Sequence, residues 1–194
     1  MKNELEICVK YLGTRKDVVE ELKEYGFVPK EDFTMKDTYY VKESEDIALE
    51  NSDKLLSSYI LIREVVDRDV TFVLKEKQFN EKGEIVKQAS CKCPIIDKNK
   101  GKEFLTNIGY KELIQLNDHN TLVSNGKNEI YIQDVENLGV YLEMEQKNLH
   151  SDNNNGENIE EMKDNLNSYN LNIAKDNYFV KKSYDMLKNV INNN

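Results

Sequence analysis

The stretch that decides the fold is residues 4–10, Glu-Leu-Glu-Ile-Cys-Val-Lys. Polar and apolar side chains alternate along it with a period of two, which is the pattern of a β-strand whose two faces meet different surroundings. The polar residues Glu4, Glu6, Cys8 and Lys10 share one face, and the apolar residues share the other. The polar face is therefore a solvated surface, an internal ion-pair network or the lining of a cavity.

A second stretch of the same kind occurs late in the chain, at residues 140–145, where Glu143 and Glu145 occupy alternate positions. Like charges that are held together are unfavourable unless a cation compensates them. Hard divalent ions prefer oxygen ligands and usually combine one or two carboxylates with substrate phosphates. If both strands face one cavity, their carboxylates predict a metal site.

The rest of the pattern predicts mainly strands joined by short turns, with helices between them. Strands are expected at residues 37–42, 58–64, 70–75, 84–93, 113–116, 121–124, 129–133 and 140–145, and helices near 14–26, 104–108, 157–166 and 179–190. About eight strands with such connections favour an α+β fold, a closed antiparallel β-barrel with flanking and C-terminal helices.

The chain has 194 residues, of which 39% are hydrophobic. This length and composition suit one core, so a single domain is expected over residues 1–190. The polar run at 151–156 is predicted to be a mobile loop, and the Asn-rich end at 191–194 is predicted to be a disordered tail.

Charge excludes some classes of partner. Lys and Arg number 27 against 36 Asp and Glu, giving a formal net charge of -9, so the overall field repels nucleic acid and anionic lipid. No apolar run approaches the roughly 20 residues of a membrane span. A cytoplasmic protein is expected, with no nucleic-acid or membrane partner, and the sequence leaves a homodimer open.

Six short motifs carry a resemblance to a known family. They are residues 4–6 (Glu-Leu-Glu), 37–40 (Asp-Thr-Tyr-Tyr), 60–63 (Ile-Leu-Ile-Arg), 72–75 (Phe-Val-Leu-Lys), 134–145 (Asp-Val-Glu-Asn-Leu-Gly-Val-Tyr-Leu-Glu-Met-Glu) and 182–187 (Lys-Ser-Tyr-Asp-Met-Leu). In this order they resemble the CYTH, or triphosphate tunnel metalloenzyme, superfamily, and are most similar to class IV adenylate cyclase-like proteins.

The resemblance implies a barrel of the triphosphate-tunnel type, in which glutamates hold Mg²⁺ or Mn²⁺ and basic side chains hold a nucleoside or inorganic triphosphate. The cation would neutralise phosphoryl oxygens while the protein positions the nucleophile. Carried over by position, the candidates are Glu4, Glu6, Glu143 and Glu145 for the metal, Arg63 and Lys75 for substrate phosphates, and Asp134 and Lys10 for catalysis.

The phosphate-binding half of the pattern is degenerate. The lysine expected two residues after Glu6 is Cys8, and the first of two expected arginines is Leu61. Where family members often have an Arg-x-Glu-x-Glu strand, this chain has Lys87, Ala89 and Cys91. Cys91 is expected to face the same interior as Cys8. Residues 113–120 contain no lysine or arginine where a Lys-x-Arg pair is expected, and each lost charge-assisted contact weakens binding by roughly 1.5–3 kcal/mol.

Three hypotheses follow. The first is a divalent-metal-dependent enzyme on a triphosphate, either a class IV adenylate cyclase or an organic or inorganic triphosphatase. The second is a catalytically impaired relative that binds a metal or a small anionic ligand without turnover. The third is an interaction domain whose polar interior is only structural.

Overall fold

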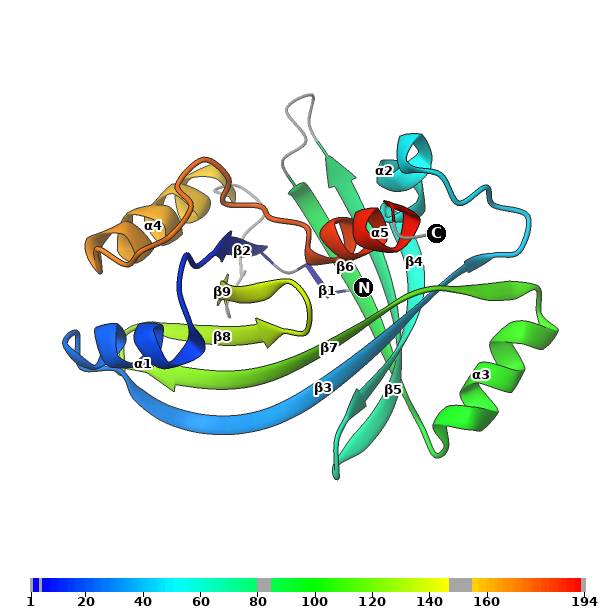
Figure 1. The fold of residues 1–194 in the computed structure, drawn as a ribbon, viewed down its shortest axis with the longest axis horizontal. Coiled ribbons are helices and arrows are strands. Elements are labelled where there is room, and N and C mark those ends of the chain that lie inside the picture. Colours follow the sequence, from blue (N-terminus) through cyan, green and yellow to red (C-terminus); the bar gives the residue numbers. More distant parts are fainter. Residues whose placement is uncertain (1, 4, 80–84, 147–154, 193–194) are drawn as a thin grey trace. The chain divides into compact units, whose positions relative to one another are not determined.

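The computed structural model describes residues 2–3, 5–79, 85–146 and 155–192, and divides the chain into two compact units. Unit 1 comprises Met1–Asn3, Thr34–Asn117 and Lys181–Asn194, and unit 2 comprises Glu4–Phe33 and Asp118–Val180. The long strands β3 (Val28–Lys42) and β7 (Tyr110–Ser124) contribute residues to both units (Figure 1). The single domain expected over residues 1–190 stays a prediction.

Unit 1 is built on antiparallel strands in the order β1-β6-β5-β4-β3. Its elements are β1 (Lys2–Asn3), the later part of β3, the 3₁₀ turn η1 (Leu49–Asn51), α2 (Ser52–Leu55), β4 (Ser58–Val65), β5 (Asp69–Phe79), β6 (Ile85–Ile95), α3 (Lys98–Asn107), the first part of β7 and α5 (Lys182–Asn192). Helix α5 contacts α2 and η1.

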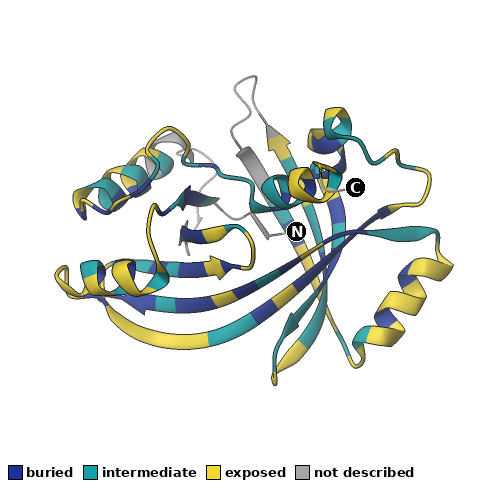
Figure 2. Cartoon of the chain, in the orientation of Figure 1, coloured by how far each residue is buried: buried dark blue, intermediate teal, exposed yellow. Residues whose placement is uncertain are grey.

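The hydrophobic core of unit 1 lies between its sheet and α3. Leu105 projects from α3 against Tyr40 and Ile62, and partly buried side chains such as Phe72 surround them. Helix α3 starts at the N-cap Asp97, whose carboxylate accepts from the Lys100 backbone N–H. Figure 2 shows the resulting two-sided helix, exposed on its outer side and buried where it meets the strands.

Truncation of the Leu105 side chain is expected to destabilise unit 1. Leu105 is 2% exposed, so Leu105→Ala should lower the free energy of unfolding by about 2–5 kcal/mol through lost burial and a residual cavity. Urea unfolding measures the change. Asn107→Ala, at an exposed position of the same helix, is the control and should stay within about 0.5 kcal/mol of the parent. Equal midpoints for the parent and the Leu105 variant would contradict this packing.

Unit 2 contains antiparallel strands in the order β7-β8-β9-β2. Its elements are β2 (Leu5–Lys10), α1 (Arg15–Lys23), the first part of β3, the later part of β7, β8 (Glu129–Val135), β9 (Gly139–Gln146) and α4 (Asn155–Ser168). Helix α4 contacts β2, and α1 contacts β8. The segment before Val180 adds backbone pairing to β2, since Cys8 exchanges hydrogen bonds with Tyr178 and Val180.

A capping box fixes the start of α1. The Thr14 hydroxyl accepts from the Asp17 backbone N–H, and the Asp17 carboxylate accepts from the Thr14 backbone N–H at 3.0 Å and from its hydroxyl at 2.7 Å. The hydrogen bonds from Thr14 hold the pKa of Asp17 below its ordinary value. The helix then buries Val18 and Leu22.

The capping box makes stability depend on pH in a defined direction. Because the folded state lowers the pKa of Asp17, its charged carboxylate stabilises the fold above about pH 4, and this contribution is lost as pH falls through the folded pKa. Asp17→Asn should therefore lower Tm near neutral pH, with the difference from the parent shrinking toward about pH 3. Circular dichroism melts at both pH values measure this, and a difference of the same size at both would contradict it.

The antiparallel strands and the helices confirm the α+β class, but several boundaries differ from the predictions. Residues 113–116 and 121–124 were expected to be separate strands and belong to one, β7, because its polar middle pairs with β8 from Asp118 to Ser124. Helix α3 begins six residues before the predicted Phe104, since Asp97 provides the cap.

The predicted loop and tail are only partly described. Residues 151–154 and 193–194 lie outside the described residues. Asn155 and Gly156 belong to α4, and Ile191 and Asn192 end α5, so these four residues are helical rather than loop or tail. Within the described ranges, no helix combines the length and apolar character needed to span a membrane.

Candidate functional site

Three glutamates converge on one face of unit 2. Strands β2 and β9 pair antiparallel with Glu6 opposite Glu145 and Cys8 opposite Glu143. One carboxylate oxygen from each of Glu6, Glu143 and Glu145 lies within 4.8 Å of the others. These three residues are called the carboxylate group below. Glu4, the fourth metal candidate, lies outside the described residues.

The apolar faces of the two strands fix this register. Ile7, Val9 and Leu142 are 0% exposed and Met144 is 5% exposed, and a shift by one residue would move these side chains to the opposite face. The glutamates alternate with them and must therefore share the other face. Glu6 and Glu143 are half-buried, whereas Glu145 is exposed. The pattern that predicted the strands thus also brings the acids together.

The donor set of the carboxylate group suits a hard divalent cation. Three negative charges so close together repel one another, most strongly where burial lowers the dielectric. Oxygens bound to one Mg²⁺ lie at most about 4 Å apart, given bond lengths near 2.1 Å. Small side-chain rotations of Glu6, Glu143 and Glu145 from the observed separation would meet that requirement.

Of the two catalytic candidates, the structure brings only one to this face. Lys10 alternates in step with Glu6 and Cys8 and pairs with Tyr141, and its Nζ lies 5.7 Å from the centre of that ring. Asp134 is three residues from Tyr131, the partner of Glu143, so it lies on the opposite face of β8 and is exposed. Asp134 therefore does not share the face of the carboxylate group, because neighbours in a strand alternate, and its catalytic role stays a prediction.

The two substrate candidates belong to unit 1 and share one face of its sheet. Arg63 pairs with Asp37 on β3, and Lys75 pairs with Tyr59, which lies four residues from Arg63 on β4. The Arg63 guanidinium donates from Nε to Asp37 Oδ1 at 2.8 Å and from Nη2 to Asp37 Oδ2 at 2.6 Å. Asp37 is almost completely buried, so this bidentate pair occupies two of the five N–H donors of Arg63.

The register of β6 corrects the prediction for the cysteines and reveals another lysine. Ser90 pairs with Lys75, so Ser90 and Lys92 share the face of Lys75, while Cys91 pairs with Leu74 on the other face and is exposed. The expectation that Cys91 faces the interior was one residue out of register. Lys92 was missed for the same reason.

Unit 1 also contains a cavity of about 280 Å³ at one end of β4, lined in part by Tyr40, Tyr59, Tyr110 and Lys54. Burial, together with the nearby Glu112 carboxylate, raises the pKa of Tyr40 to about 12. On the core side of the same sheet, a hydrogen bond from Lys98 lowers the pKa of Glu64.

Comparison with known proteins supplies the family. Over 181 residues the chain is 30% identical to the protein of Methanocaldococcus jannaschii named "Putative adenylate cyclase", covering 93% of this chain and 95% of that protein. This chain belongs to the family of that protein. No family model matches the sequence.

Solved structures share the fold at low identity. The PH1819 protein of Pyrococcus horikoshii aligns with a TM-score of 0.72 and 20% identity over 98% of this chain and 99% of its own. A protein of Vibrio parahaemolyticus described as a "putative adenylate cyclase" aligns with a TM-score of 0.70 and 10% identity over 96% and 98%. At these identities the similarity supports the α+β fold alone.

The Asp37–Arg63 pair makes a testable prediction about this site. Asp37→Ala leaves a partly buried guanidinium without its bidentate partner and should lower the free energy of unfolding by about 3 kcal/mol. The matched control is Glu45→Ala, which breaks the more exposed pair with Lys54 and should cost about 1 kcal/mol or less. Urea unfolding compares the two. Equal effects would show that the Asp37–Arg63 pair does not stabilise the fold as proposed.

Proposed function

We propose that this protein is a divalent-metal-dependent enzyme of the CYTH type that acts on a triphosphate, as a class IV adenylate cyclase or as a triphosphatase. The observation that carries the proposal is the convergence of Glu6, Glu143 and Glu145 within 4.8 Å. The name of the Methanocaldococcus relative, "Putative adenylate cyclase", supports ATP as a substrate. The closed barrel with its tunnel belongs to this proposal.

In the proposed site, the carboxylate group holds Mg²⁺ or Mn²⁺. The bound cation would neutralise charge on the phosphoryl oxygens. Lys10 lies on the same face of β2 as Cys8, the residue that pairs with Glu143. The two residues are about 7 Å apart along the strand, so Lys10 would place an ammonium near the metal. Arg63 and Lys75, which belong to unit 1, stay the proposed phosphate-binding residues on the ground of the sequence resemblance, and Arg63 keeps Asp37 as its internal partner.

A second candidate function is binding without turnover. Residues 113–120 of β7 contain no lysine or arginine where a Lys-x-Arg pair was expected, and two donors of Arg63 already bind Asp37. A triphosphate brings about four negative charges, so fewer basic contacts weaken its binding by orders of magnitude. Under this alternative the metal binds to the carboxylate group, but no product is released.

Metal binding is tested first, by its effect on thermal stability. A ligand that binds only the folded state stabilises it by about 2.7 kcal/mol at one hundred times its Kd, so Mn²⁺ should raise Tm. Glu143→Gln removes one ligand and should abolish most of this rise. Glu136→Gln, on the exposed turn before β9, is the control and should keep it. An equal rise in both variants would exclude the carboxylate group as the metal site.

Turnover separates the two candidate functions. The protein is incubated with Mn²⁺ and, in separate reactions, ATP, thiamine triphosphate or tripolyphosphate, and cyclic AMP and phosphate are measured. Product that disappears in Glu143→Gln but persists in Glu136→Gln would support an enzyme. No product from any substrate, together with a Mn²⁺-dependent rise in Tm, would support the binding protein instead.

A further inference from the structure

The cavity of unit 1 has the size and the mixed lining of a small-molecule site. Its volume of about 280 Å³ is close to the lower end of the range of about 300–1,000 Å³ that is usual for ligand pockets. All of its lining residues belong to unit 1. It lies where the segment that carries η1 and α2 meets the end of β3 and the start of β4 (Figure 1). None of the residues proposed above for metal or phosphate binding lines it.

The floor of the cavity is apolar and aromatic. Tyr40 pairs with Ile60, and Ile60 pairs with Leu74, so these three side chains form a row on one face of the sheet. It is the face that packs against α3, opposite the face of the proposed phosphate-binding residues. Tyr110 adds a second aromatic ring to the lining. A flat ring suits this floor, because ring pairs gain more than the burial of their area alone.

The Tyr40 hydroxyl is a polar group that this floor leaves available. Tyr40 is 2% exposed, and its hydroxyl makes no hydrogen bond with any described residue. Within the same residues, the side-chain atoms that lack a partner and are sealed from solvent belong to Glu21, Asp118 and Asn120, so the Tyr40 hydroxyl is not sealed off. Burial raises the pKa of Tyr40 to about 12. The hydroxyl therefore stays protonated at neutral pH and can donate to a ligand.

The rim of the cavity carries a net positive charge. Its charged lining residues are Lys42, Glu45 and Lys54. Lys54 Nζ lies 2.6 Å from Glu45 Oε2, so these two charges offset each other. Lys42 forms no ion pair with any described residue, and it lies about 7 Å from Tyr40 along the same face of β3. Lys111 Nζ, which donates to the backbone carbonyl of Glu45 at 2.8 Å, adds positive charge beside the rim.

The cavity is open to solvent on the side of this rim. Lys42, Lys54 and Ser58 all line it, and all three are exposed. A ligand can therefore enter beside the Lys42 ammonium and reach the aromatic floor behind it.

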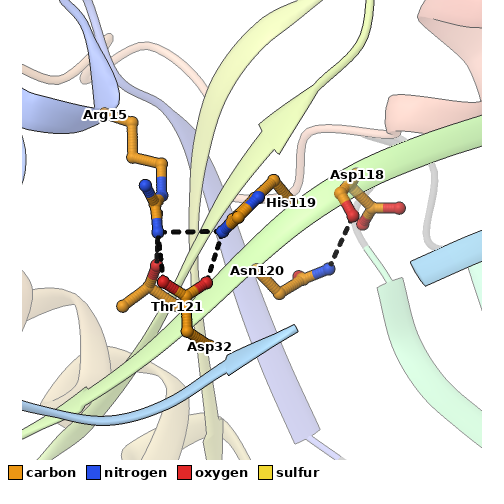
Figure 3. A network of polar contacts seen from close by, with 6 residues as sticks. All are labelled: Arg15, Asp32, Asp118, His119, Asn120 and Thr121. Atoms are coloured by element: carbon orange, nitrogen blue, oxygen red, sulfur yellow. Dashed lines mark hydrogen bonds and ion pairs between the residues drawn. The ribbon is translucent and has the colours of Figure 1, made fainter. Parts of the chain in front are cut away.

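A cluster of charged groups in unit 2 provides a contrast (Figure 3). Arg15 donates from Nη2 to Asp32 Oδ2 at 2.8 Å and from Nε to Thr121 Oγ1 at 3.1 Å, and His119 Nε2 contacts Asp32. These groups bind one another, and the positive charge of Arg15 is offset within the cluster. The charge of Lys42 is not offset in this way.

We propose that the cavity of unit 1 binds a small aromatic carboxylate. The ring lies on the row formed by Tyr40, Ile60 and Leu74, and the carboxylate meets the Lys42 ammonium at the rim. One ammonium without an ion-pair partner matches the single negative charge of a carboxylate better than the charge of about two on a phosphate monoester. The proposal concerns a second site and does not depend on the function proposed above.

The ligand class is tested with three probes, in the absence of Mn²⁺ and nucleotide. They are 4-hydroxybenzoate, its neutral analogue 4-hydroxybenzamide, and 4-hydroxycyclohexanecarboxylate, which keeps the charge and lacks the aromatic ring. NMR titrations give the dissociation constants. 4-Hydroxybenzoate should bind about tenfold more tightly than the amide, the value of one charge-assisted hydrogen bond. It should bind about threefold more tightly than the saturated acid, because of the ring contacts.

Three variants locate the binding. Lys42→Met removes the charge from an exposed position and keeps an extended side chain, so the preference for the acid over the amide should fall close to one. Lys30→Met, at an exposed position on the part of β3 that belongs to unit 2, is the matched control and should keep the preference. Ser58→Trp places a large side chain at the cavity, on the face of Ile60, and should weaken the binding of all three probes.

Three results would overturn the proposal. They are no binding of 4-hydroxybenzoate, equal affinities of the acid and the amide in the parent, and an equal change in the Lys42 and Lys30 variants. A saturated acid that binds as tightly as 4-hydroxybenzoate would likewise overturn it, since the floor would then not select an aromatic ring. The titrations contain neither metal nor triphosphate, so none of these results bears on the proposed function.

Discussion

Electrostatic repulsion within the carboxylate group is the constraint on which the proposed site depends. Glu6, Glu143 and Glu145 have oxygens within 4.8 Å, and a folded chain tolerates such proximity only if hydrogen bonds, nearby cations or a bound ion offset it. The strands cannot relax it by slipping, because a slip would bring Ile7 and Leu142, both 0% exposed, out of the apolar interior. Burial of one face thus fixes the charge density of the other.

The basic side chains of unit 1 are positioned by an ion pair and by strand pairing. Arg63 is held by two hydrogen bonds to the buried Asp37, which fix the plane of the guanidinium. Lys75 and Lys92 share that face through the pairing of β5 with β6. So few basic residues, one of them fixed in orientation, are consistent with weaker binding of a triphosphate or with binding of an anion that carries less charge than a triphosphate.

Strand β7 lacks, over residues 113–120, the basic pair that the resemblance implies. This stretch therefore offers no permanent positive charge to a phosphate group. Asp118 and Asn120 in this stretch are buried in unit 2, on the face of β7 that continues through β8 to Glu143.

The sequence alone determined the main strands, the α+β class and the fact that Glu143 and Glu145 share one face of their strand, because a period of two is a local property of each strand. It did not determine the register itself. Cys91 was assigned to the interior and Lys92 was missed, since a shift of one residue in a strand exchanges its two faces. Polar residues 117–120 likewise suggested a break between strands, whereas pairing with β8 keeps them in one strand. Only the tertiary structure could decide these points, because hydrogen bonds between strands far apart in the sequence fix which side chains share a face.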